Sequence, residues 1–330
     1  MSSQLTMTGP CLLIGDIGGT NARFALARAD KPGFDQELTL RCADFETAEA
    51  AIAAYLARAG AGKPQAICIA AAGPVVEGTV RFTNNHWSLS AHDLAHDFQT
   101  KSVRLLNDFE AIAYSIPFLS STDCVAAGLE TASSLDDREF TVGVVGPGTG
   151  LGAAGLLRRN GVLVPIIGEG GHVGFAPESK LQMQILEILR EKFDRVSDER
   201  LVSGPGLENI YAALLALHNE KLVHASAKDI FERAAANNDV RANEALQLFY
   251  EILGQAAGNF ALAIGAVDGI YIAGGIVKRD PDLLANSRFR NAFERKGRHR
   301  SLMERIPTRV IVHSEPGLLG ASYIAFTMAA

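Results

Sequence analysis

Two segments of the chain have glycine-rich turns whose residue types suit the binding of an anion. Residues 13–27 read LIGDIGGTNARFALA, and residues 142–156 read VGVVGPGTGLGAAGL. In each, two apolar runs flank a turn of glycines with a threonine, which predicts two strands joined by a turn whose backbone goes where side chains would clash. Glycines there let successive N–H groups point at an anion, as in phosphate-binding nests. Two such turns predict two similar halves that hold one polyphosphate.

Either segment alone is also typical of an ordinary tight β-hairpin, because a glycine-rich turn is a weak signal. The pattern occurs twice, however, and a carboxylate stands in the first copy only, at Asp16. The repetition and this carboxylate favour nucleotide binding.

Asn107 and Asp108 follow an apolar strand expected at 103–106 and precede a helix expected to reach about Ser115. The carboxyl end of a strand is where open α/β sheets place ligands. With Glu110 three residues on, Asn107 also resembles a helix-capping box, which is a purely structural role. Alternatively, Asp108 accepts a proton from a substrate hydroxyl, as the catalytic-loop aspartate of protein kinases does.

Glu169 and His172 lie in the glycine-rich segment GEGGHVG, residues 168–174. A carboxylate and an imidazole held in such a turn accept and donate hydrogen bonds to a polyol. Metal ligation is the weaker interpretation, because no further His or Cys stands nearby at ligand spacing. A histidine in a loop is otherwise most often just partly exposed.

Two further motifs have weaker local signals. Glu199 precedes LVSGPGLENIY and alone resembles a surface charge, whereas Ser203 and Pro205 resemble the start of a helix. Gly274-Gly275 follows the apolar run GIYIA. That pair suits either a loop that admits a flat or phosphate-bearing ligand or a simple strand-to-helix turn.

The elements that must position these residues alternate between strands and helices, which predicts an α/β architecture. Further strands are expected at 66–72, 269–273 and 309–313, and helices at 46–59, 179–193, 206–217, 227–236 and 241–265. A length of 330 residues predicts two domains. Pro117 breaks a helix near the expected boundary, and a last helix, LLGASYIAF, is expected to pack back onto the first domain. The domains are therefore placed at 1–117 with 314–330 and at 118–313.

Composition and charge exclude several classes of function. The net charge of −6 gives no reason to expect nucleic-acid binding, although a basic stretch runs from Lys278 to Arg309. A solvated basic face is the expected role of that stretch, including Arg295, Lys296, Arg298 and Arg300. The cysteines, at 11, 42, 68 and 124, lack paired spacing and resemble small buried residues in a reducing compartment.

The start of the sequence, MSSQLTMTGP, lacks the pattern of a signal peptide. The apolar stretch 256–276 is interrupted by Asn259, Asp268 and glycines, so a helix ending near Ala266 and a following strand explain it better than a membrane span. No contact with a membrane is expected, and the expected location is the cytoplasm.

Taken together, these segments resemble the bacterial glucokinase family of the actin-like ATPase superfamily. The matching pieces are GDIGGTNARFAL, LLNDFEAIAY, GPGTGLGAAGL, GEGGHVGFAP, ERLVSGPGLENIY, IAGGIVKR and FERKGR…IPTRVIVHSEPGLLGA. They span almost the whole chain in the order that the family has. The resemblance is to the branch without the zinc-binding cysteine cluster and without the N-terminal helix-turn-helix extension of the related repressors.

The resemblance implies a role for each matching residue. Asp108 is the expected catalytic base, which contacts the sugar and takes the proton of its 6-hydroxyl. The other residues expected to hydrogen-bond the sugar are Asn107, Glu169, His172 and Glu199. The first phosphate loop comprises Gly15, Asp16, Ile17, Gly18, Gly19, Thr20 and Asn21, with Asp16 near Mg²⁺ through water. The second comprises Gly148, Thr149 and Gly150, and the adenosine is expected at Gly274 and Gly275.

The implied fold is two ribonuclease-H-like (actin-like ATPase) domains with a cleft between them. The implied reaction is ATP-dependent and Mg²⁺-dependent phosphorylation of glucose to glucose 6-phosphate, the entry step of glycolysis. A kinase for another hexose or an amino sugar is the alternative, followed by a sugar-sensing regulator or a chaperone-like ATPase. Homodimers are frequent in the family, which implies a homodimer here.

Overall fold

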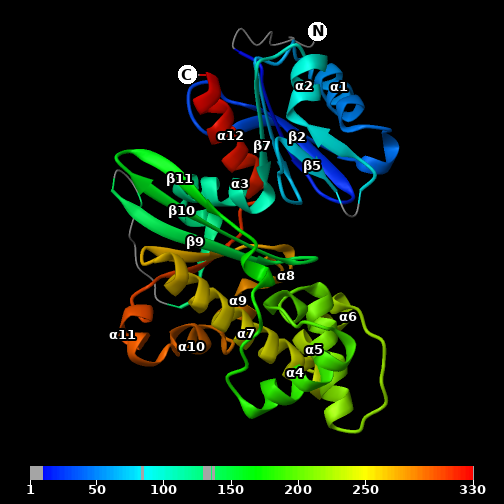
Figure 1. Ribbon diagram of the computed structural model, residues 1–330, viewed down its shortest axis with the longest axis vertical. Coiled ribbons are helices and arrows are strands. Elements are labelled where there is room, and N and C mark those ends of the chain that lie inside the picture. The colour runs from blue at the N-terminus through cyan, green and yellow to red at the C-terminus, as the bar shows by residue number, and fades with distance from the viewer. Residues whose placement is uncertain (1–9, 83–84, 129–134, 136–137, 330) are drawn as a thin grey trace. The chain divides into compact units, whose positions relative to one another are not determined.

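The computed structural model describes residues 10–82, 85–128, 135 and 138–329. Contacts between residues divide the chain into two compact units (Figure 1). Unit 1 comprises Met1–Leu119 with His313–Ala330, and unit 2 comprises Ser120–Val312. Each unit is built around its own sheet and its own hydrophobic core.

The sheet of unit 1 has the strand order β3-β2-β1-β4-β7. Its strands are β1 (Leu12–Ile17), β2 (Asn21–Ala27), β3 (Phe34–Arg41), β4 (Ala66–Ala71) and β7 (Ser102–Asn107). β1 pairs with β2 antiparallel and with β4 parallel, and β7 adds parallel to β4. The first predicted hairpin is confirmed, whereas the sequence analysis did not find β3.

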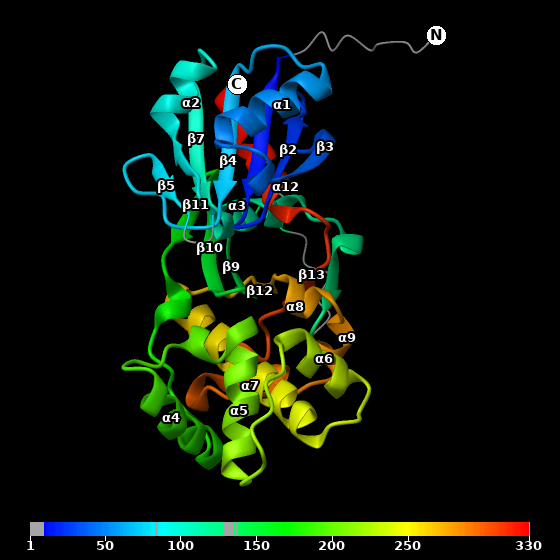
Figure 2. The ribbon, with the colours of Figure 1, turned by 90° about the vertical axis from the view of Figure 1, so that its right-hand side faces the viewer.

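Helices cover both faces of this sheet (Figures 1 and 2). On one face lie α1 (Ala48–Ala59) and α2 (Ala91–Asp97), and on the other α3 (Asp108–Ser115) and α12 (Pro316–Ala329). α12 contacts β1, β4 and α3. At Gly320 a side chain would collide with the carbonyl oxygen of Ala111, so a glycine is what lets α12 and α3 approach so closely. A separate small hairpin joins β5 (Thr79–Arg81) and β6 (Ser88–Ser90).

The sheet of unit 2 has the order β11-β10-β9-β12-β13-β8. Its strands are β8 (Cys124–Ala126), β9 (Phe140–Pro147), β10 (Leu151–Arg159), β11 (Val162–Ile167), β12 (Gly269–Ile272) and β13 (Thr308–Ile311). The first five positions repeat unit 1, because β11, β10 and β9 pair antiparallel and β12 and β13 then add parallel. The second predicted hairpin, β9–β10, is confirmed.

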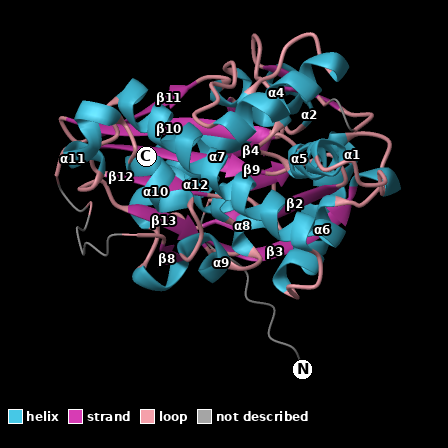
Figure 3. Cartoon of the chain, turned by 90° about the horizontal axis from the view of Figure 1, so that it is seen from below, coloured by secondary structure: helices cyan, strands magenta, loops and turns pink. Residues whose placement is uncertain are grey.

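Helices form a thick layer beside this sheet. They are α4 (Lys180–Lys192), α5 (Gly204–Leu217), α6 (Ala227–Ala235), α7 (Val240–Ile264), α8 (Gly275–Lys278), α9 (Pro281–Ala285), α10 (Phe289–Glu294) and α11 (Arg300–Met303). α7 lies along β9, and α5, α6 and α10 pack on α7 (Figures 2 and 3). α7 ends at Ile264 and is capped by Gly265, whose φ of 68° suits glycine, and β12 follows as predicted.

No helix in the described part of the chain is long and apolar enough to cross a membrane.

Two predictions about surface and core need correction. The basic stretch is not simply a solvated face, because the Lys296 side chain is only 6% exposed and its ammonium lies 3.4 Å from Glu178. Arg290 of the same stretch is also largely buried and donates to the carbonyl oxygen of Ile306 and to Thr308. The basic stretch therefore contributes to the internal structure of unit 2.

Of the four free cysteines, Cys42 and Cys68 are buried, whereas Cys11 and Cys124 are partly exposed.

Candidate functional site

The turn between β1 and β2 exposes backbone donors in unit 1. Gly18 closes the turn by donating its N–H to the carbonyl of Asn21 at 2.9 Å. Gly19 and Thr20 are exposed, and within the described residues no hydrogen bond occupies their N–H groups. Gly15 and Ile17 have a different role, because Ile17 is fully buried and a side chain at Gly15 would press against Phe24 and Ile69. Only the tip of the loop is therefore open to an anion.

Two carboxylates lie near each other at the carboxyl ends of β1 and β7. Burial and, to a smaller extent, the charge of Asp108 raise the pKa of Asp16, and Arg23 opposes them, so that the resulting pKa is about 6. Asp16 Oδ2 also lies 2.9 Å from the point where a side chain at Gly317 would begin, so the first turn of α12 backs onto this carboxylate. The structure thus brings Asp16 and Asp108 together within unit 1.

Asn107 caps the N-terminus of α3, as its resemblance to a helix-capping residue predicts. Its Oδ1 accepts from the N–H of Phe109 at 2.9 Å, and its Nδ2 donates to the carbonyl of Gly73 at 3.1 Å. Asp108 Oδ1 accepts from the same Phe109 N–H, also at 2.9 Å. Each side chain has one anchored oxygen, so the carboxamide and the carboxylate are held in fixed positions at the start of the helix.

The second loop, between β9 and β10, has the same form in unit 2. Gly148 donates its N–H to the carbonyl of Gly150 at 2.8 Å, and Thr149 is exposed at the tip. Glu199 supports the loop from behind, because its Oε2 accepts from the N–H of Leu151 at 2.9 Å. A side chain at Gly150 would collide with that same carboxylate oxygen.

Glu199 also links the second loop to the segment 168–174. His172 Nε2 lies 3.8 Å from Glu199 Oε2, and both belong to short 3-10 turns, Gly170–His172 and Asp198–Arg200. Glu169, just before the first of these turns, is exposed. Gly171 allows no side chain, because a Cβ would collide with the carbonyl oxygen of Leu151. Within unit 2 the structure therefore groups Glu199 and His172 beside the loop that holds Gly148–Gly150.

A cavity of about 210 Å³ adjoins the second loop, and Gly148 and Thr149 form part of its wall. The sequence analysis missed its other walls: Gly204, Pro205, Leu207, Glu208, Ala227, Lys228, Phe231, Ile276 and Arg279. The Arg279 guanidinium lies 5.4 Å from the centre of the Phe231 ring. Only the run GPG at 204–206 gives a sequence signal for this part of the cavity, because the other lining residues are of types that occur in any helix.

Gly274 and Gly275 directly precede Ile276, which lines this cavity. Gly274 has a φ of 101°, and a side chain there would collide with the carbonyl of Pro147. Gly275 begins α8 directly before Ile276, a cavity residue. These glycines therefore bring α8 close to the second loop.

The residues around Asp16 fit a Mg²⁺ ion. Two neighbouring carboxylates, one with a raised pKa, form a site at which a cation offsets both burial and like-charge repulsion. Within the described residues no group of three or more His, Cys, Asp or Glu is arranged to hold a metal. Mg²⁺ suits such a sparse site, because it retains waters and binds through one or two carboxylates together with substrate phosphates.

The fold first defines the class of the protein. A crystal structure of glucokinase from an Antarctic psychrotroph superposes with a TM-score of 0.86 at 34% identity, covering 94% of this chain and 97% of that one. A ROK family glucokinase from Streptomyces griseus, solved with glucose and AMPPNP, shares the fold at a TM-score of 0.63 and 20% identity, covering 94% of this chain and 98% of its own. The chain thus has the α/β fold of sugar kinases.

The sequence comparisons define the family. The family model described as Glucokinase matches residues 13–328. The glucokinase of Caulobacter sp. (strain K31) is 42% identical over 313 residues, which are 94% of this chain and 93% of the relative. The chain belongs to the glucokinase family.

Proposed function

We propose that this protein transfers the γ-phosphate of Mg-ATP to the 6-hydroxyl of glucose, giving glucose 6-phosphate and ADP. The observation that carries the proposal is the pair Asp16 and Asp108, which interact electrostatically at the carboxyl ends of β1 and β7 in unit 1, in a chain of the glucokinase family. Phosphoryl transfer to an alcohol needs a cation beside the phosphates and a base for the hydroxyl proton. In this proposal Asp16 serves the cation and Asp108 serves the hydroxyl.

Asp108 acts as the general base in this proposal. The oxygen of the 6-hydroxyl forms a bond to the γ-phosphorus while the bond from that phosphorus to the bridging oxygen of ADP breaks. The hydroxyl proton passes to Asp108, and the electron pair of the broken bond leaves with ADP. The hydrogen bond from the Phe109 N–H to Oδ1 orients the Asp108 carboxylate, which is the proposed acceptor of the proton.

The two loops bind the phosphates in this proposal. N–H groups of Gly19 and Thr20 in unit 1 and of Thr149 and Gly150 in unit 2 are the proposed donors. Asp16 would hold Mg²⁺, which would neutralise charge on the phosphate oxygens when bound. The cavity beside Gly148, Gly274 and Gly275 is the proposed place of the adenosine, where the apolar faces of Phe231 and Ile276 suit a base.

Selectivity for the sugar follows from polar groups that must be paired. Asn107, Glu169, His172 and Glu199 are the proposed partners of the sugar hydroxyls. A sugar that lacks one of these hydroxyls, or presents it on the other face, leaves a buried polar group unpaired, which is costly. Glu199 is already oriented by the Leu151 N–H, so it is prepared for this role before the sugar arrives.

The residues proposed to act together belong to both units, so the proposal requires a cleft between two ribonuclease-H-like domains. We identify the two units with those domains. Closing of the cleft around glucose excludes water, which is a competing acceptor of the phosphoryl group. Small-angle scattering at saturating glucose is expected to show compaction, and an unchanged radius of gyration contradicts glucose-driven closure.

The test is ADP release with Mg-ATP across glucose, mannose, fructose, galactose, N-acetylglucosamine and no sugar. Strong dependence on glucose, with little activity on the others, supports the proposal. Preference for another sugar keeps the catalytic role of Asp108 and replaces the substrate. Release of ADP without any sugar overturns the sugar-kinase function.

A further inference from the structure

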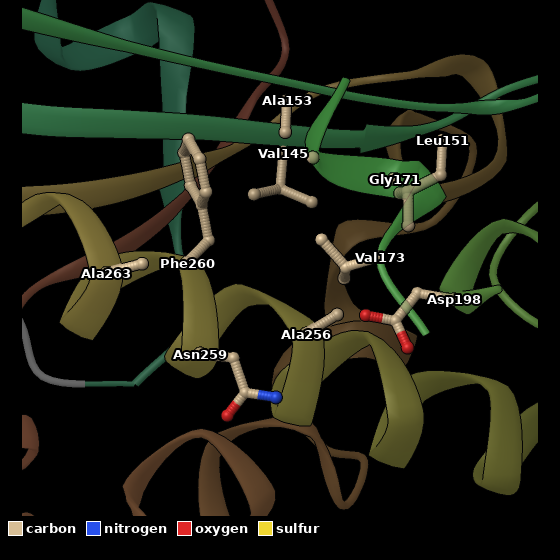
Figure 4. A pocket seen from close by; sticks show the side chains of 11 residues that line it. Val145, Leu151, Ala153, Gly171, Val173, Asp198, Ala256, Asn259, Phe260 and Ala263 are labelled. Carbon is tan, nitrogen blue, oxygen red and sulfur yellow. The ribbon is translucent and has the colours of Figure 1, made fainter. Parts of the chain in front are cut away.

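A second cavity, of about 130 Å³, lies within unit 2 and contains none of the residues proposed for catalysis (Figure 4). Val145 of β9 and Ala153 of β10 form one wall, and Ala256 and Phe260 of α7 form the opposite one. The segment Gly170–Val173 closes a third side. Apart from two side chains, Asp198 and Asn259, the described lining is apolar.

Asp198 is an unusual residue for such a wall. It is only 7% exposed, and Figure 4 shows its carboxylate pointing into the cavity toward Ala256. Its backbone is fully used, because its N–H donates to Val173 O at 3.0 Å and its carbonyl accepts from Leu201 and Val202. Its carboxylate, in contrast, has no hydrogen bond or ion pair within the described part of the chain.

Lys296 is the cation whose charge reaches Asp198, but it does not pair with it. Its ammonium donates to the carbonyl of Gln255 at 3.1 Å and lies 3.4 Å from Glu178 Oε1. Burial raises the pKa of Asp198 and the charge of Lys296 offsets this only in part, so that the resulting pKa is about 7. An unpaired carboxylate in an apolar cavity is costly, so the fold alone does not explain an aspartate here.

We propose that this cavity binds a small primary alkylammonium ion, with its ammonium on Asp198 and its carbon chain against β9, β10 and α7. The mouth of the cavity lies beside Asn259 and Val173, which are both exposed. A cavity of about 150 Å³ elsewhere holds benzene, so this one accommodates about five or six non-hydrogen atoms. Butylammonium and isobutylammonium have this size, and each carries one charge to match one carboxylate.

The experiment is calorimetric titration of the full chain, without sugar or nucleotide, with butylammonium chloride at pH 8. We expect saturable binding of one ion with a Kd of about 1 mM, the range that so few atoms reach. The neutral isostere 1-butanol is expected to bind at least about tenfold more weakly, since it cannot form the charge pair. Absence of saturable heat, or equal affinity for butanol, overturns the proposal.

Variants locate the binding. Asp198→Asn, which keeps the shape and removes the charge, is expected to weaken butylammonium binding at least about tenfold and to leave butanol unaffected. Asp194→Asn is the matched control, because Asp194 is an exposed aspartate of the same loop. Ala256→Leu fills the cavity and should abolish binding of both compounds. Unchanged binding in Asp198→Asn and Ala256→Leu would place the ion elsewhere on the protein and refute the site.

Discussion

The two glycine-rich loops occupy the same place in two sheets that share a five-strand order, yet their surroundings differ. The loop of unit 1 lies beside the carboxylates Asp16 and Asp108. The loop of unit 2 has no carboxylate in its own turn, and Glu199 reaches it from a separate segment to hold the Leu151 N–H. The same glycine-rich turn therefore lies beside two carboxylates suited to catalysis in unit 1. In unit 2 it lies beside a carboxylate that is already oriented for binding.

The strand order therefore determines where each loop lies, but it does not determine the chemistry at that loop. Each loop follows the third strand in its sheet order, β1 in unit 1 and β9 in unit 2, where a turn exposes N–H groups at the carboxyl end of that strand. The chemistry then depends on which side chains the neighbouring strand ends and loops supply. We therefore expect substitutions in unit 1 to affect turnover and those in unit 2 to affect binding.

The largest effect is expected for Asp108→Ala. Loss of the general base should lower kcat by about 10²–10⁴-fold, while Asn107 still accepts from the Phe109 N–H and preserves the start of α3. Steady-state ADP release measures kcat, and circular dichroism checks the fold. Near-normal turnover in this variant would refute the division of labour between the units.

Asp198→Asn tests a buried carboxylate in unit 2 through stability. The folded-state pKa of about 7 lies above the unfolded value of about 3.9, so the folded protein holds this proton more tightly and loses stability as pH rises from about 4 to 7. An asparagine at this position does not titrate, so the stability of the variant lacks this pH dependence. The variant should therefore gain up to about 4 kcal/mol over the parent at pH 8 and little at pH 4.

Denaturant unfolding at the two pH values measures this difference. Asp194→Asn, at an exposed position of the same loop, should show no such pH dependence. An equal effect of Asp198→Asn at both pH values contradicts an ionised, buried Asp198.

Asp16→Asn is expected to lower activity about 10–100-fold at limiting Mg²⁺, the usual cost of losing a group that orients a metal through water. Excess Mg²⁺ should restore part of the loss, as a titration of activity against Mg²⁺ will show. Thr149→Val in the second loop is the matched variant, and its Mg²⁺ dependence should stay that of the parent. A similar Mg²⁺ shift in both variants would remove the distinction between the loops.

Gly150→Ala should raise the KM for glucose about three- to tenfold with little change in kcat. The new methyl group displaces the Glu199 carboxylate and costs its hydrogen bond to Leu151. Gly148→Ala is the control for stability, because a side chain there meets no protein atom within 4 Å. Thermal unfolding should distinguish the two, with Gly150→Ala the less stable. Equal KM values for Gly150→Ala and the parent argue against a sugar contact at Glu199.

The strands that sequence reasoning missed are edge strands. β3 reads FDQELTLR and is mostly exposed, so it has little apolar content to reveal it. β11 contains Pro165, which argues against a strand except at an edge. The buried strands β1, β4, β9 and β12 were predicted because buried strands are nearly continuous apolar runs.

The sequence by itself determined the two hairpins, the family and the helix start at Asn107–Asp108, because these depend on local patterns and on residues adjacent in the chain. Only the tertiary structure decided that Asp16 lies near Asp108, that Glu199 holds the second loop, and that Phe231 and Arg279 share a cavity wall with Gly148. It also decided that Lys296 is buried and that Asp198 points into a cavity. Such contacts join residues distant in the chain, and burial depends on packing that no local pattern records.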